Sequence, residues 1–211
     1  MKFIAFVLIS LVSLMPSLAQ AQDTKPPQVQ VEVIVFQSLA LRGWTEEYWP
    51  DLIELPPTEN AIHFNSTQAY ARLVDADRLT LKDELAKMTT AQGYDVLAHF
   101  AWQQPALDRE NAKPILIDQF VQRRRLESSI LFGTIRMYQE RFAHVDVHLE
   151  LDRQIPTRIR ERFAEHQQID SDWMTEGWRF QLNESRRVRY GQLHYLDHPI
   201  FGVLIKVDRV D

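Results

Sequence analysis

Residues 130–151, ILFGTIRMYQERFAHVDVHLEL, decide the fold because apolar and polar residues alternate along their second half. The apolar members are Val145, Val147 and Leu149, and the polar members are His144, Asp146, His148 and Glu150. Successive side chains of a strand point to opposite faces, so this period predicts a strand over 142–151. The polar residues 139–141 separate it from the apolar-rich residues 130–138, which is the spacing of an antiparallel hairpin. We expect one face to be core and the other to meet water or a ligand.

Three other stretches also have the composition of strands. Residues 29–36 become apolar on both faces, which indicates a strand in the middle of a sheet. Residues 201–207 predict a closing strand. Residues 94–102 are expected to form a strand whose core face carries Val96, Ala98, Phe100 and Trp102.

The strand period returns at residues 178–189, where Trp178, Phe180 and Leu182 alternate with Arg179, Gln181 and Asn183. If the register continues, one face is polar and the other is mixed. The polar face then includes Ser185, Arg187 and Arg189, and the mixed face holds Glu184, Arg186, Val188 and Tyr190.

The helix signals are fewer. Residues 79–92 predict a helix that Thr80 caps, with Asp83 three residues on, and that Gly93 ends. Residues 66–74 and 155–168 are weaker candidates, and residues 39–62 are expected to be a long loop packed by its tryptophans. Strands joined by short turns, with two helices, indicate an α+β fold in which a largely antiparallel sheet carries its helices on one face.

Composition limits the class of protein. The chain has 211 residues, of which 45% are hydrophobic, enough for one domain with a substantial core. Its formal net charge of -5 argues against a general nucleic-acid binder. The chain contains no cysteine, which excludes a lipid-anchored cysteine, disulfides and thiol chemistry.

The first 21 residues have the pattern of a secretory signal. Lys2 precedes an apolar run, and Ala19 and Ala21 supply the small residues of a cleavage site. The run is shorter than the roughly 20 residues that span a bilayer. We therefore expect cleavage after Ala21, a single α+β domain over 22–211, and no membrane anchor in the mature protein.

Several patterns could carry chemistry. The polar members of 144–150 could bind zinc, form a solvated face, or hydrogen-bond a ligand; the solvated face fits the alternation best. His194 and His198 are four apart but lack the interior glutamate of a zinc helix. Ser185, His194 and Asp197 lack the glycine-flanked serine of a hydrolase. We therefore expect no catalytic residue, no metal site and no cofactor, and we expect His194, Asp197 and His198 to stabilise a turn.

The stretch 184–202, ESRRVRYGQLHYLDHPIFG, combines basic and aromatic residues. Its arginines could form structural ion pairs or a clamp for ligand carboxylates, since a guanidinium can bind a carboxylate with two hydrogen bonds. The candidate ligand-binding residues are Arg186, Arg187, Arg189, Tyr190 and Tyr195. Each of the five tryptophans could pack in the core or stack on a sugar ring.

The segment SRRVRYGQLHYLDHPIFGVLIKV resembles the C-terminal signature of the CsiV family of periplasmic peptidoglycan-binding proteins. VEVIVFQS followed by EEYWP is similar to that family's opening elements, whereas Tyr190 stands where the family more often has a small polar residue. The resemblance implies a non-catalytic periplasmic protein that binds peptidoglycan and supports wall synthesis alongside penicillin-binding proteins and their outer-membrane activators. The alternatives are a module that only docks on such an activator and, less favoured, a wall hydrolase.

Overall fold

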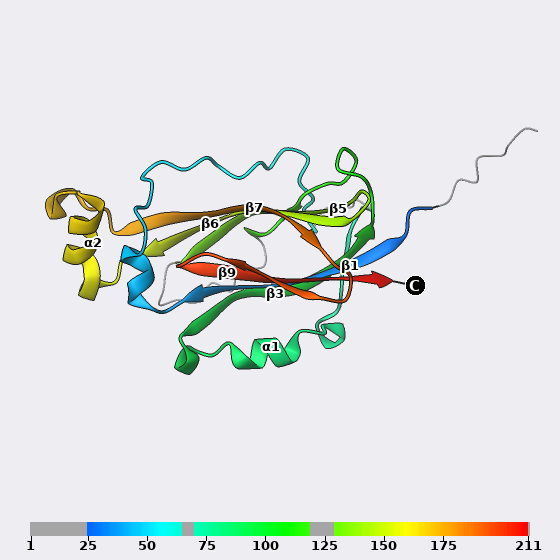
Figure 1. The fold of residues 1–211 in the computed structure, drawn as a ribbon, viewed down its shortest axis with the longest axis horizontal. Helices are drawn as coiled ribbons and strands as arrows, with labels where there is room; N and C mark the ends of the chain where they lie inside the picture. The colour runs from blue at the N-terminus through cyan, green and yellow to red at the C-terminus, as the bar shows by residue number, and fades with distance from the viewer. Residues whose placement is uncertain (1–24, 65–69, 119–128, 211) are drawn as a thin grey trace, which may run out of the picture.

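The computed structural model describes residues 25–64, 70–118 and 129–210, which form two antiparallel sheets (Figure 1). The five-stranded sheet has the order β2-β3-β1-β9-β8, and the four-stranded sheet has the order β4-β5-β6-β7. The strands of the first are β1 (Gln28–Ser38), β2 (Arg72–Leu73), β3 (Tyr94–Pro105), β8 (Leu193–Asp197) and β9 (Phe201–Val210). Those of the second are β4 (Ile115–Leu116), β5 (Ile130–Gln139), β6 (Ala143–Gln154) and β7 (Gly177–Val188).

The two sheets pack face to face and share one apolar core (Figure 1). Alternate residues of β1, including Val31 and Val33, point into this core from one sheet, and Val145 and Val147 of β6 point into it from the other. The hairpin of β5 and β6 and the central place of β1, between β3 and β9, were both predicted from the sequence and are confirmed.

Helices are short and lie in different places, so the predicted arrangement of helices on one face of a sheet is not what the structure shows. α1 (Lys82–Lys87) lies against the outer face of the five-stranded sheet, and α2 (Arg160–Gln167) lies at one end of the molecule (Figure 1). The fold is mostly β because each sheet buries its inner face against the other sheet and needs no helical layer there. The described ranges also contain the 3-10 helices η1 (Leu41–Thr45), η2 (Ala76–Arg78), η3 (Thr90–Gln92), η5 (Thr157–Ile159) and η6 (Ser171–Trp173).

The helix predicted over 79–92 is shorter than expected, and its cap is different. Thr80 directs its backbone N–H and its hydroxyl to the carboxylate of Glu32 in β1, while Leu81 occupies the N-cap position. Tertiary hydrogen bonds have therefore replaced the local capping box. In the candidate helix 66–74, residues 66–69 lie outside the described part, and Arg72–Leu73 form an edge strand. The predicted signal segment also lies outside it.

A bulge corrects the predicted core face of β3. Val35 of β1 pairs with Ala98, but the next residue, Phe36, pairs with Val96, so Leu97 is the extra residue. Ala98 and Leu97 both join the main core, whereas Val96 packs with Phe36 on the opposite face, beneath α1. One inserted residue thus reverses the alternation, which a strict period of two does not predict.

Within the described ranges, the structure has no helix with the length and apolar character needed to cross a bilayer.

Candidate functional site

The outward side of β5, β6 and β7 carries most of the polar side chains that the strand alternation predicts. We call it the polar face and define it by Arg136, His144, Asp146, His148, Ser185 and Arg187. The strand register aligns these residues in rows across the sheet. Arg136, Asp146 and Ser185 are opposite one another in one row, and Tyr138, His144 and Arg187 form the neighbouring row.

Asp146 is the centre of the first row. Only 2% of its side chain is exposed, and two polar groups contact it. Nη2 of Arg136 lies 2.5 Å from its Oδ2, and the Ser185 hydroxyl donates to its Oδ1 at 2.6 Å. Arg109, from the segment after β3, adds a contact at 3.5 Å. Burial on its own would raise the pKa of Asp146, but these hydrogen bonds and positive charges outweigh burial and lower it. The carboxylate is therefore ionised at neutral pH and holds Arg136 in place.

The second row is built from stacked rings and guanidinium groups. The rings of Tyr138 and His144 lie 5.1 Å apart and nearly parallel, and the guanidinium groups of Arg109 and Arg136 lie within 6 Å of the Tyr138 ring. Arg187 lies over the ring of Phe142, with 4.2 Å between the guanidinium carbon and the ring centre. The exposed Arg187 is thus held by a cation–π contact on the polar face.

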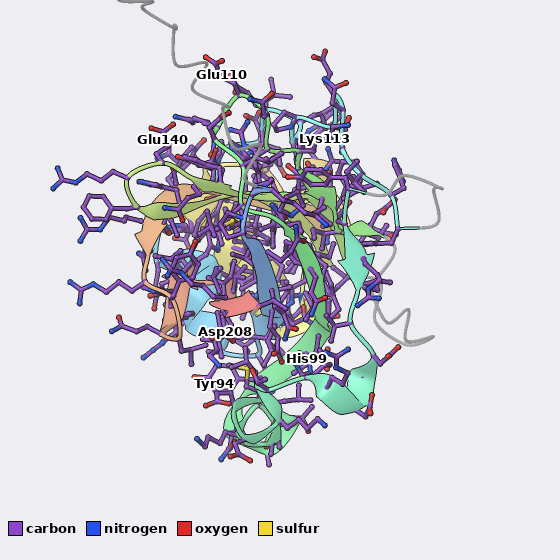
Figure 2. All side chains as sticks on the ribbon, turned by 90° about the vertical axis from the view of Figure 1, so that its right-hand side faces the viewer. Tyr94, His99, Glu110, Lys113, Glu140 and Asp208 are labelled. Carbon is purple, nitrogen blue, oxygen red and sulfur yellow. The ribbon has the colours of Figure 1, made fainter. Side chains whose placement is uncertain are left out.

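A pocket of about 490 Å³ opens beside the first row. It is bounded by the segments 57–60 and 110–114 and floored by the strands. Figure 2 shows Glu110 and Lys113 on the side of the four-stranded sheet, away from Tyr94 and His99 on the opposite side of the molecule. The charged residues in its lining are Glu59, Glu110, Lys113, Arg136 and Asp146, and His148 also lines it.

His148 and Glu150 continue the polar run along β6. Burial lowers the pKa of His148, so it is neutral at pH 7, and burial raises the pKa of Glu150, whose Oε2 is buried without a hydrogen-bond partner in the described part of the chain. Among the residues that the structure describes, no group of three or more histidine or acidic side chains is placed to hold a metal ion.

The three arginines of the C-terminal stretch do not form one cluster. Arg187 projects from the polar face, whereas Arg186 belongs to the other side of β7, where it pairs with Glu184 at 2.6 Å and donates to the carbonyl of Tyr195 in β8. Arg186 therefore links the edges of the two sheets. Arg189 follows the end of β7, and its side chain is exposed.

The two tyrosines lie apart from the polar face. Tyr190 is half-buried, donates its hydroxyl to the side chain of Gln139, and has Arg209 stacked on its ring at 4.7 Å. Tyr195 lies on the outer face of the five-stranded sheet, where its ring stacks on Phe36. Ligand binding by these tyrosines remains a prediction, and a single ligand on the polar face beside Arg187 would not reach Arg186 on the other side of β7.

The histidines and aspartate of this stretch make local hydrogen bonds. Nε2 of His194 accepts from the backbone N–H of Arg189, and Nδ1 of His198 accepts from that of Ile200. Asp197 accepts from the Tyr195 hydroxyl. Burial lowers the pKa of His198 to about 4 despite the opposing charge of Asp197, so its ring packs in the neutral form.

The tryptophans separate clearly into two groups. Those in the core are Trp44, Trp49, Trp102 and Trp178. Trp173, which ends η6 beyond α2, is 82% exposed. Trp173 is therefore the tryptophan whose ring is accessible to a ligand.

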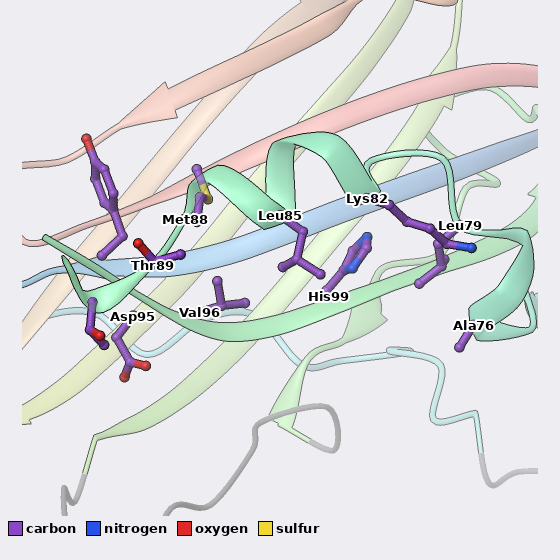
Figure 3. A pocket seen from close by; sticks show the side chains of 11 residues that line it. Ala76, Leu79, Lys82, Leu85, Met88, Thr89, Asp95, Val96 and His99 are labelled. Atoms are coloured by element: carbon purple, nitrogen blue, oxygen red, sulfur yellow. The ribbon is translucent and has the colours of Figure 1, made fainter. Parts of the chain in front are cut away.

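A second pocket, of about 680 Å³, lies between α1 and the outer face of the five-stranded sheet (Figure 3). Leu85 of α1 and Met88, which follows the helix, face Val96 and His99 of β3 across it, and Lys82 stands at its rim (Figure 3). This groove is more apolar in lining than the pocket on the polar face, and it lies on the opposite side of the molecule.

The strand alternation predicted the outward residues of β6 and, in β7, Ser185 and Arg187, but it did not identify their partners in β5 and in the segments beside the sheet. The outward position of Arg136 could have been predicted, because the alternation that places Asp146 outward also applies to β5, its partner strand in the hairpin. The segment after β3 has no regular alternation of apolar and polar residues. No local sequence pattern therefore predicts that its residues Arg109, Glu110 and Lys113 lie beside the sheet.

The fold is thus a mostly β sandwich of two antiparallel sheets, and a pocket lined by charged side chains opens on the four-stranded sheet. The family model for CsiV, described as a peptidoglycan-binding protein, matches residues 3–210. The chain therefore belongs to the CsiV family, as its terminal segments indicated. Searches of curated proteins and of solved structures each find no match.

Proposed function

We propose that this protein is a non-catalytic accessory protein of the periplasm that binds peptidoglycan and supports cell-wall synthesis. The family match over nearly the whole chain carries the ligand class. The observation that favours a location on the molecule is the polar face, where ionised Asp146 holds Arg136 beside an open pocket and Arg187 is exposed.

The physical chemistry of the polar face suits a polar, charged polymer. Peptidoglycan presents hydroxyls, amides and carboxylates, and guanidinium groups bind carboxylates with charge-assisted hydrogen bonds. A sheet face accommodates an extended strand of polymer better than a deep enclosed cavity does. Binding through such exposed charges weakens as salt rises.

The test is sedimentation of the purified mature protein with isolated sacculi at about 0.05 M and about 0.5 M salt. We expect the wild-type protein to sediment at low salt, and the Arg187→Ala variant to sediment less. Arg162→Ala, an exposed arginine of α2, is the matched control and should behave as wild type. Full sedimentation of the Arg187 variant would move the binding surface away from the polar face, and soluble muropeptides released by the protein would support the hydrolase alternative.

The second candidate function is a module that docks on an activator of a penicillin-binding protein. The groove beneath α1 favours it, since Leu85 and Met88 line an apolar opening on the side opposite to the polar face. A pure docking module would remain in the supernatant with sacculi alone and would sediment only when a wall-bound activator is added. The replacement Met88→Glu should then abolish the added sedimentation and leave any direct binding unchanged.

A further inference from the structure

We infer that the pocket on the polar face binds the peptide stem of peptidoglycan rather than its glycan. This inference rests on the proposed function and deepens it, because it names the part of the polymer that the pocket recognises. The stem peptide bears free carboxylates and, on its diamino acid, an ammonium group, whereas the glycan offers mainly hydroxyls, acetamido groups and apolar sugar faces.

The lining of the pocket matches a ligand with both charges. Lys113 and Arg136 supply cations, and Glu59 and Glu110 supply anions, from segments that approach one another only in the folded chain. The other lining residues are small, polar or proline; none of them is phenylalanine, tyrosine or tryptophan, and the imidazole of His148 is the one aromatic ring in the lining. Sugar recognition commonly uses a ring that stacks on the apolar face of the sugar, so this lining favours a zwitterionic peptide.

Tyr138, in the neighbouring row of the polar face, is not available for stacking. Tyr138 is 4% exposed, and its ring already contacts the His144 ring and two guanidinium groups. Its position in the row beside the pocket thus strengthens the scaffold and provides no platform for a sugar.

The cation at the base of the pocket is preorganised. Asp146 engages Nε and Nη2 of Arg136, and among the described residues Nη1 has no hydrogen-bond partner. The Arg136 side chain is 29% exposed, so part of its guanidinium faces the pocket opening while the rest is fixed. A fixed guanidinium loses little freedom when it binds a carboxylate, and Lys113 at the rim can engage a second one.

The experiment measures binding of three probes to the mature protein by calorimetry: the free tetrapeptide stem, the disaccharide carrying that stem, and glycan strands stripped of peptide by an amidase. We expect the two peptide-bearing probes to bind with dissociation constants within about twofold of each other, and the stripped glycan to bind at least about tenfold more weakly. Lys113→Ala should raise the dissociation constant for the stem by about tenfold, since one charge-assisted contact is lost.

Two further variants make the test specific. Glu110→Gln should also weaken stem binding, because it removes an anion that faces the ammonium group, whereas Lys87→Ala, at the exposed end of α1 on the opposite side, should not. Equal or tighter binding of the stripped glycan, or stem binding that Lys113→Ala leaves unchanged, overturns the inference. If sacculi sediment the protein but no stem probe binds, the inference fails and the proposed function stands; if sacculi do not bind, the proposed function itself fails.

Discussion

Oε1 of Glu32 in β1 lies 2.9 Å from Nε2 of His99 on the neighbouring strand β3, on the outer face of the five-stranded sheet. The carboxylate is 1% exposed and also accepts hydrogen bonds from the backbone N–H groups of Thr80 and Leu81 and from the Thr80 hydroxyl. Burial would raise the pKa of Glu32, but these donors outweigh it and lower the pKa to about 2. One buried carboxylate thus fastens the start of α1 to the sheet.

Replacing this carboxylate should destabilise the protein at neutral pH. A lowered pKa means that Glu32 contributes stability above about pH 4.5, and that the contribution disappears as the pH falls from 4.5 towards 2. We expect Glu32→Gln to reduce the free energy of unfolding by about 1–3 kcal/mol at pH 7, since the variant loses a charged acceptor of several hydrogen bonds. Urea unfolding at pH 7 and pH 3 measures this, with exposed Asp83→Asn as the control. A difference that is as large at pH 3 as at pH 7 would contradict the assigned ionisation.

A buried histidine should make the protein sensitive to mild acid. His198 packs against Trp49 and Phe201, and burial lowers its pKa to about 4. Between about pH 6.5 and pH 4 His198 binds a proton in the unfolded chain but not in the folded chain. The free energy of unfolding therefore falls as the pH falls through this window. The expected loss is on the order of 2–3 kcal/mol.

The replacement His198→Phe should abolish this loss of stability between about pH 6.5 and pH 4. The variant keeps an aromatic ring at this position but has no group that binds a proton. It loses the hydrogen bond from the backbone N–H of Ile200, which should lower the free energy of unfolding at pH 7 by about 1 kcal/mol. Urea midpoints of both proteins between pH 7.5 and pH 4.5 test the idea. Parallel curves for the two proteins would show that another group produces the acid sensitivity.

The strands were the predictable part of this fold because alternation is a local signal. In β6 the inward residues from Ala143 to Leu151 are all apolar, in β7 Trp178, Phe180 and Leu182 are inward, and the register from Trp178 to Val188 follows the prediction. β8 was missed, because Leu193–Asp197 alternates weakly and pairs only with β9. The predicted boundaries of the helix over 79–92 were also wrong, because the start of α1 depends on hydrogen bonds to Glu32, which is far away in the sequence.

The candidate site shows the same division between local and distant information. The outward direction of Asp146 and Arg187 followed from period alone, and the structure bears it out. The separation of Arg186 from Arg187 also followed, although proximity in sequence had suggested a shared clamp. The pocket itself depends on Lys113 and Glu110, whose approach to β5 and β6 is a property of the whole chain.

The two classes of tryptophan should differ sharply on truncation. Trp44 is fully buried and meets Phe163 and Phe180 edge to face, so Trp44→Ala should cost about 3–5 kcal/mol of unfolding free energy. Trp173 is exposed, and Trp173→Ala should change stability by less than about 0.5 kcal/mol. Thermal or urea unfolding of the two variants measures the contrast, and a comparable loss in both would mean that Trp173 is covered in solution.

The last prediction separates two neighbouring arginines on opposite sides of β7. Arg186 and Glu184 are 40% and 28% exposed, so their ion pair is partly solvated and contributes at most about 1 kcal/mol. Losing the hydrogen bond to the Tyr195 carbonyl adds about 1 kcal/mol, because it links the two sheet edges. We therefore expect Arg186→Ala to destabilise the fold by about 1–2 kcal/mol and to leave sacculus binding unchanged when the protein is folded.

Arg187→Ala should have the opposite effects. Its guanidinium covers only the exposed ring of Phe142, so stability should change by less than about 1 kcal/mol, while sedimentation with sacculi should fall. Urea unfolding and sacculus sedimentation of both variants, on the same preparations, provide the comparison. If Arg186→Ala reduces binding and Arg187→Ala does not, the ligand lies along the seam between β7 and β8, and the polar face is only a solvated surface.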